Sequence, residues 1–212
     1  MKGLIRLVLA FALISGAAEA GHAQNLIIDG GFETPVVPNG SGTGFGLGQT
    51  FSKWVVTGDP GDVVITSGMY TANGFTFPAH SGQQWLNLFV TSSTPIGVQQ
   101  TVTTNPGSVY QLTFWVGNAY GFGGNASSTV NVFVNDQLLT SVINTGGKGK
   151  TALVWHQFSA NFTASTDVTT VTFINANPAG YGGVNGLDNV SLELVPNAAF
   201  PGVTGQFSIP AR

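Results

Sequence analysis

Cysteine is absent from the 212-residue sequence, and charged side chains make up only 7% of it. An average soluble domain has about a quarter of its residues charged. Without cysteine no disulfide bond can form, so stability has to come from an apolar core and from any bound ion. Together with the 30 glycines, the low charge argues against an ordinary cytosolic enzyme.

Basic residues are especially scarce after the first 23 positions. That part of the chain has eight acidic residues, and its basic residues are only Lys53, Lys148, Lys150 and Arg212. Proteins that bind nucleic acid or anionic membranes usually present clustered lysine and arginine. We therefore expect neither kind of partner.

Residues 1–23 have the features of a signal peptide. Lys2 and Arg6 precede an apolar stretch, and small residues allow cleavage after Ala20 or Ala23. A retained membrane anchor is the weaker alternative, because the apolar stretch is far shorter than the roughly 20 residues that span a bilayer. We predict a secreted protein, extracellular or periplasmic, with one domain over 24–195, a polar tail over 196–212 and no membrane insertion after cleavage.

Alternation of apolar and polar residues dominates the rest of the chain. In residues 109–118, Tyr110, Leu112 and Phe114 share one strand face, and Gln111 and Thr113 share the other. Similar segments are KWVV, DVVIT, QWLNLFV, GVQQTVTT, TVNVFVN, LLTSVI, ALVWHQFSANF, VTTVTFIN and LDNVSLEL. About ten short strands separated by Gly-rich turns predict an all-β, antiparallel two-sheet sandwich, with a jelly roll as the leading topology.

Two acidic residues stand out in this nearly uncharged chain. Alternation in LDNVSLEL places Asp188 on the face of Val190 and Leu192, which we expect to face the core. A buried carboxylate needs a partner. If the terminal strands lie side by side, Glu33 comes close to Asp188, and a calcium ion would compensate both charges. The alternative is that Asp29 closes an Asx turn and Asp188 accepts hydrogen bonds from loop amides.

The same segments carry a family resemblance that spans about residues 25–194. The chain resembles the galactose-binding-like jelly rolls of the CenC type, a group that includes carbohydrate-binding modules, in NLIIDGGFE, Trp54, HSGQQWLNL, VYQLTFWVGN and GLDNVSLEL. The resemblance implies a structural Ca²⁺ with Glu33 and Asp188 as side-chain ligands and carbonyl groups of the HSG loop completing the shell. It also implies glycan binding.

Glycan binding requires aromatic faces for the sugar rings and amide or hydroxyl groups for the sugar hydroxyls. Residues of these types occur in loops and on the polar faces of strands. The candidates are Trp115, Tyr120, Phe122, Asn118, Tyr70 and Tyr181. The alternative for each of them is packing beneath a loop.

Catalytic motifs are few. His80 and His156 are the only histidines after residue 23, and neither lies in a recognisable catalytic or zinc-binding motif, so we interpret both as structural. Asp59 and Asp62 are the carboxylate pair that a hydrolase would use. We predict a non-catalytic protein that binds polysaccharide, with a self-associating surface or matrix protein as the first alternative and a glycoside or ester hydrolase as the second.

Overall fold

The computed structural model describes residues 24–88, 95–122, 127–178 and 184–196. The predicted signal peptide, the candidate Tyr181 and nearly all of the predicted tail lie outside these ranges. Among the described residues, no helix is long and apolar enough to cross a membrane.

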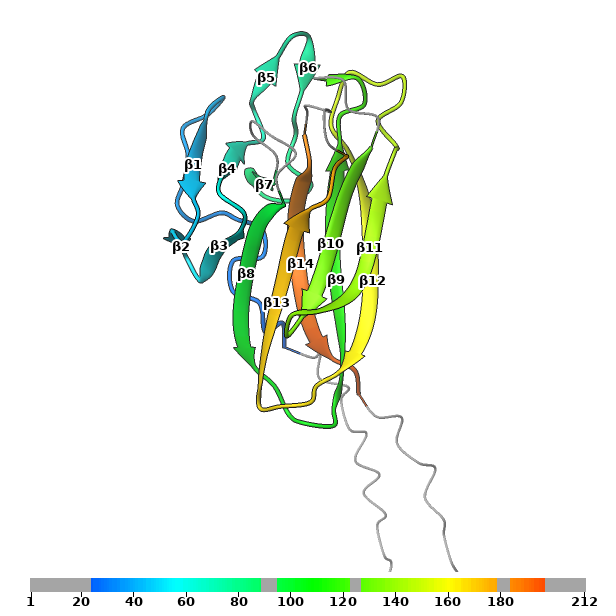
Figure 1. The fold of residues 1–212 in the computed structure, drawn as a ribbon. Coiled ribbons are helices and arrows are strands. Elements are labelled where there is room, and N and C mark those ends of the chain that lie inside the picture. The colour runs from blue at the N-terminus through cyan, green and yellow to red at the C-terminus, as the bar shows by residue number, and fades with distance from the viewer. Residues whose placement is uncertain (1–23, 89–94, 123–126, 179–183, 197–212) are drawn as a thin grey trace, which may run out of the picture.

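Two six-stranded antiparallel sheets face one another (Figure 1). Sheet A has the order β1-β4-β7-β14-β9-β12, and sheet B has the order β11-β10-β13-β8-β3-β2. The hairpin β5-β6 lies apart from both. The bounds are β1 Gly42–Gly46, β2 Thr50–Phe51, β3 Trp54–Gly58, β4 Asp62–Ser67, β5 Thr71–Ala72, β6 Phe75–Thr76, β7 Gln84–Asn87, β8 Ile96–Thr103, β9 Val109–Asn118, β10 Ser128–Val134, β11 Gln137–Asn144, β12 Val154–Thr163, β13 Val168–Asn175 and β14 Gly186–Leu194.

The main core lies between the sheets and is formed by the inward half of each alternating pattern. Leu112 and Phe114 of β9 are fully buried, as are Val98 of β8 and Phe173 of β13. The Phe114 and Phe173 rings pack edge to face at 5.1 Å. Burying an aliphatic or aromatic side chain of this size stabilises the fold by about 1.5–3 kcal/mol. The predicted all-β sandwich, with all ten predicted strands, is confirmed.

A second, smaller apolar cluster lies on the outer face of sheet A. Leu86 of β7 points into the main core, so the neighbouring Trp85 points outward, where it packs on Phe77 with ring centroids 6.4 Å apart. Ala72 and Phe75 of the β5-β6 hairpin pack against this cluster, and the hairpin itself lies at one end of the sandwich (Figure 1). We call the cluster the hairpin cluster, and its aromatic members are Tyr70, Phe75, Phe77, Trp85, Phe122 and Trp155.

The first described residues run beside the last strand. Leu26 N donates to Leu192 O at 2.8 Å, and Val190 N donates to Gly30 O at 2.9 Å. Asn25 Oδ1 accepts a hydrogen bond from Leu192 N at 2.9 Å. This pairing brings the segment that carries Glu33 beside the strand that carries Asp188, as the sequence predicts for the terminal strands.

Candidate functional site

Glu33 and Asp188 lie on either side of Gly31. A methyl group placed on Gly31 would be 3.8 Å from both Asp188 Oδ1 and Glu33 Cγ. The turn that positions Glu33 depends on Asp29, whose carboxylate accepts hydrogen bonds from Glu33 N at 2.7 Å and Thr34 N at 3.2 Å. Asp29 thus accepts hydrogen bonds from the backbone four and five residues ahead, and not from the residue two ahead as in the Asx turn that was the alternative. This role coexists with the approach of the two other acids.

One loop supplies backbone donors to both carboxylates. Asp188 Oδ2 accepts hydrogen bonds from His80 N at 2.9 Å and Ser81 N at 3.1 Å. Glu33 Oε1 accepts hydrogen bonds from Gln83 N at 2.8 Å and Gln84 N at 3.1 Å. The HSG segment therefore lies against both acids, and it presents amides to them.

The structure corrects the predicted direction of the Asp188 side chain. Asp188 pairs with Trp115 on β9, but the register then shifts, and Ser191 pairs with Thr113. The extra residue forms a β-bulge, with Asn189 at φ 50°. As a result Asp188 points to the outer face of sheet A, whereas Val190 and Leu192 point into the core. It is nevertheless fully buried, because the loop after β6 covers it.

This burial changes the charge state of Asp188. Loss of solvation raises the pKa of Asp188 from 3.8 to about 7, although the amides of Ser81, Asn189 and His80 act in the opposite direction. The nearby negative charge of Glu33 raises it further. Burial also raises the pKa of Asp29. Burial next to a second acid therefore disfavours the ionised form of Asp188.

A cation at this position would find hard oxygen donors, which is the donor type that calcium prefers. The described residues contain no cluster of three or more His, Cys, Asp or Glu side chains suited to a metal. Any shell around Glu33 and Asp188 would thus need backbone carbonyls or water. Asp188 Oδ2 and Glu33 Oε1 each accept two N–H groups already. The oxygens that would face a cation are therefore Asp188 Oδ1, which accepts only Asn189 N and keeps a further lone pair, and Glu33 Oε2.

Trp115 stacks on His80 beside the buried acid. The indole and imidazole centroids are 3.6 Å apart with an interplanar angle of 19°. Burial lowers the pKa of His80, so the imidazole is held in its neutral form. The Trp155 ring packs edge to face on the His80 ring, with centroids 6.3 Å apart and an interplanar angle of 69°, and Trp155 Nε1 donates to Pro78 O. All three side chains are half-buried.

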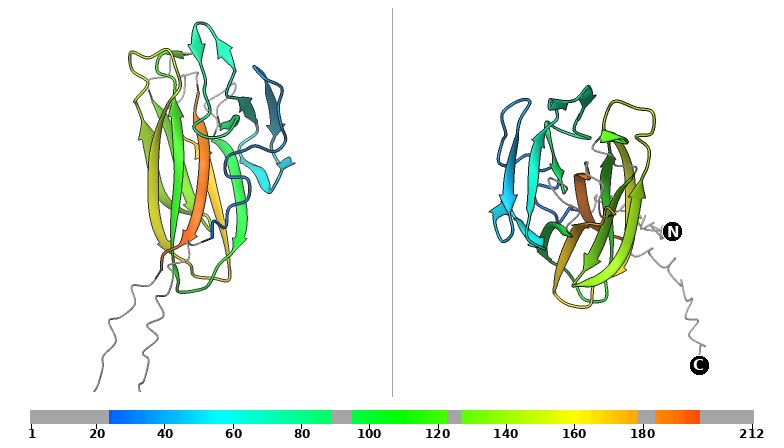
Figure 2. Two further views of the ribbon diagram at one scale, coloured as in Figure 1. Left: turned by 180° about the vertical axis from the view of Figure 1, so that it is seen from behind. Right: turned by 45° about the horizontal axis from the view of Figure 1, so that its top comes forward.

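Polar side chains continue from this stack along the outer face of sheet A. The register pairs Trp115 with Gln157, Thr113 with Ser159, and Gln111 with Asn161. Neither β9 nor β12 carries a charged side chain on this face of sheet A. The face is turned toward the viewer in the left view of Figure 2. We call the surface formed by His80, Trp115, Trp155, Gln111, Thr113, Gln157, Ser159 and Asn161 the sheet A platform.

The other predicted ligand residues are not in one place. Tyr70 and Phe122 belong to the hairpin cluster, where both pack on Phe77 at 5.5 and 5.0 Å. Asn118 is fully buried, and its side chain bonds to Ser128 Oγ and Gly147 N. Tyr120 is half-buried in the loop after β9. Trp115 therefore lies on a partly exposed surface, whereas Asn118 makes buried hydrogen bonds inside the protein.

Sequence reasoning missed His80 as a partner of Trp115. Its position before Ser81 gave no sign of stacking, because the contact joins residues from two distant segments. The signal that could have found it is the HSG resemblance, which places this loop over the last strand. Trp155 was likewise not among the candidates, although its register opposite Gly117 puts it beside Trp115.

The fold defines the chain as an antiparallel two-sheet β-sandwich, a fold that also occurs in carbohydrate-binding modules. It is similar to the module TmCBM61, solved in complex with β-1,4-galactotriose, with a TM-score of 0.53 and 23% identity over 82% of this chain and 100% of that one. It is also similar to a cyclase from Fischerella sp. TAU, solved with an indolyl butanone, with a TM-score of 0.61 and 19% identity over 83% of this chain and 100% of that one. At these identities the likeness shows the fold alone.

The chain belongs to the family described as protein of unknown function (DUF642), whose model matches residues 25–190. No curated protein matches the sequence. The CenC-type assignment remains a resemblance.

Proposed function

We propose that the protein binds carbohydrate, non-catalytically, along the sheet A platform. The observation that carries this proposal is the Trp115–His80 stack, a partly exposed aromatic surface that continues into a row of uncharged amides and hydroxyls. Aromatic rings suit the apolar faces of pyranoses, and amides and hydroxyls suit their hydroxyl groups. The shared fold with a module solved with galactotriose supports the same role.

A structural calcium ion between Glu33 and Asp188 is the second part of the proposal. It is supported by the approach of two carboxylates around Gly31 and by the raised pKa of Asp188. The ion would tie the first segment and β14 to the loop after β6. It would thereby hold His80 against Trp115, which makes its role structural.

A catalytic role has less support, although a cyclase shares the fold. An acid that keeps its proton near neutral pH suits proton donation. Asp188 is fully buried, however, and it accepts three backbone N–H groups. Asp59 lies in the turn before β4, and Asp62 is the first residue of β4. In sheet A, β7 and β14 separate β4 from β9.

Affinity electrophoresis against a polysaccharide panel that includes β-1,4-galactan tests the binding proposal. We expect one polymer to retard the protein, and Trp115→Ala to weaken that retardation about tenfold or more, equivalent to about 1.4 kcal/mol, because it removes the stacking surface. The matched control is Phe133→Ala, which removes a half-buried aromatic from the outer face of sheet B.

Equal retardation of wild type and Trp115→Ala would move the binding site away from the platform. No retardation by any polymer, with circular dichroism showing a folded protein, would favour the association alternative. That alternative has one structural point in its favour: β12 is an edge strand of sheet A with no Asp, Glu, Lys or Arg over its ten residues.

A further inference from the structure

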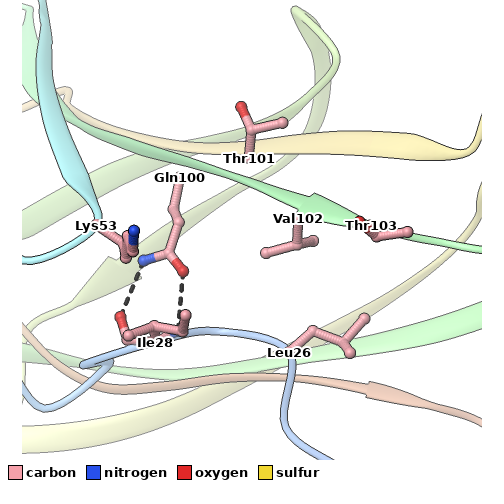
Figure 3. Close-up of a pocket in the computed structure, with 7 residues that line it drawn as sticks. All are labelled: Leu26, Ile28, Lys53, Gln100, Thr101, Val102 and Thr103. Atoms are coloured by element: carbon pink, nitrogen blue, oxygen red, sulfur yellow. Dashed lines mark hydrogen bonds between the residues drawn. The ribbon is translucent and has the colours of Figure 1, made fainter.

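A pocket of about 370 Å³ lies where the first described segment meets β8, away from the sheet A platform. This volume is within the range of about 300–1,000 Å³ that is typical of ligand sites. The pocket is shown in Figure 3, and its lining residues are Leu26, Ile28, Lys53, Gln100, Thr101, Val102 and Thr103.

The pocket exists because β3 is shorter than its neighbour. Pairing of β3 with β8 starts at Val55 and Gln99, so the last residues of β8 have no β3 partner. Ser52 and Lys53 form the two-residue turn between β2 and β3, with Ser52 at φ 49°. This turn directs the chain away from β8. The space left beside residues 100–103 is closed on its other side by Leu26 and Ile28.

The wall opposite β8 is fixed by hydrogen bonds. Gln100 is almost fully buried, and its amide accepts from Ile28 N at 2.8 Å and donates to Ile28 O at 2.9 Å (Figure 3). Trp54 Nε1 donates to Asp29 O at 2.9 Å directly after this segment. A preformed wall reduces the ordering cost of binding.

Lys53 supplies the only charge in the pocket lining. Lys53 is exposed, and within the described ranges no ion pair involves it. Asp29, the acid that follows Ile28 in the first segment, directs its carboxylate to Glu33 N and Thr34 N. The pocket therefore combines one free cation with the apolar side chains of Leu26 and Val102 and with threonine hydroxyls at its rim.

We propose that this pocket binds a hexuronate unit of an acidic polysaccharide. The uronate carboxylate would pair with the Lys53 ammonium group, and the apolar face of the sugar ring would lie against Leu26 and Val102. Thr103 offers its hydroxyl to the ring substituents, whereas the Thr101 hydroxyl is hydrogen-bonded to Thr170 Oγ1 at 2.8 Å. The site uses none of the residues of the sheet A platform, so it adds a second, acid-selective site to the proposed carbohydrate binding.

Methyl NMR of the full protein tests this assignment, with trigalacturonate as the probe and galactotriose as its neutral counterpart. We expect trigalacturonate to shift the methyl signals of Leu26, Ile28 and Val102, and galactotriose to leave them in place. Lys53→Gln should weaken trigalacturonate binding about two- to fivefold, because an exposed ion pair contributes little more. The effect should diminish in 0.5 M NaCl.

Two controls make the result decisive. Lys148→Gln removes an exposed lysine from a distant turn and should leave the affinity unchanged. Trp115→Ala should leave it unchanged as well, so a failure of the sheet A platform is distinguishable from a failure of this pocket. Unshifted pocket methyls, an unaltered affinity of Lys53→Gln, or equal shifts with acetate alone would each overturn the proposal.

Discussion

At the scale of single residues, Gly82 shows how tightly the loop after β6 fits the two acids. A methyl group at this position would lie 2.2 Å from Glu33 Oε1, and its φ of 66° is a conformation that favours glycine. The loop can present its amides to Glu33 only because no side chain intervenes there.

Gly82→Ala should therefore destabilise the protein by about 2–4 kcal/mol, the sum of backbone strain and the displacement of Glu33. The matched control is Gly74→Ala, because Gly74 has a φ of 80° but no atom within 4 Å of its added methyl group. That variant should lose only about 1–2 kcal/mol. Urea unfolding measures the loss of stability in both variants. Equal losses would show that the close contact between Gly82 and Glu33 does not contribute to stability.

Residue types and their order were readable from the sequence, but the partners of individual side chains were not. Glu33 and Asp188 were predicted to approach each other, and they do. Asn118 has the composition of a ligand residue, yet the fold buries it against Ser128 and Gly147. Nothing in the sequence next to Asn118 distinguishes these outcomes, because Ser128 begins β10 and Gly147 lies in the turn between β11 and β12.

At the scale of elements, the bulge in β14 decides which face Asp188 occupies. Strict alternation would have pointed this carboxylate into the main core. The extra residue, Asn189, is exposed with φ 50°, and its N–H donates to Asp188 Oδ1 at 2.6 Å. Asn tolerates this left-handed conformation far better than a β-branched residue does.

Asn189→Val should accordingly destabilise the protein by about 1–2 kcal/mol, whereas Asn189→Gly should stay within about 0.5 kcal/mol of wild type. Asn131→Val makes the same change in β10, at a half-buried position that pairs with Ser141 and Ile174 and has no positive φ, and should be tolerated. Thermal unfolding compares the three. A loss in Asn131→Val as large as that in Asn189→Val would refute a special role for the bulge.

The long strands were predictable because alternation is strong in each of them. The short strands β1, β2, β5 and β6 were not, since none of the alternating segments of the sequence includes them. The β5-β6 hairpin is held by ring contacts, such as that of Phe75 with Phe122 at 5.4 Å, which periodicity does not reveal. The bulge was missed for a similar reason, because one inserted residue leaves the apolar pattern of β14 intact.

At the scale of the whole molecule, stability should depend on pH and calcium together. The pKa of Asp188 is raised from 3.8 to about 7 in the folded protein, so the folded state binds this proton more tightly than the unfolded state does. This contribution is complete below about pH 4 and is lost as pH rises to about 7. In a chelator, we therefore expect the melting temperature to fall over this interval.

Calcium should reverse the loss, because it favours the ionised carboxylate. At pH 7 a concentration of 100 times Kd would add about 2.7 kcal/mol, and at pH 4 the gain should be smaller. Scanning calorimetry with calcium, with magnesium and with chelator measures this. Asp188→Asn should flatten both dependences. A melting temperature that does not change with calcium at pH 7 would refute the calcium site. The pH dependence in chelator would still test the protonation of Asp188.

The pairing of the first described segment with β14 has a mechanical consequence. Leu26 and Leu192 are bonded at the pole from which both described ends leave, opposite the β5-β6 hairpin (Figure 1). A force that pulls the two ends apart would act on these hydrogen bonds one after another, like the opening of a zipper, instead of shearing them together. The loop that bridges Glu33 and Asp188 would be the next connection along that line of load.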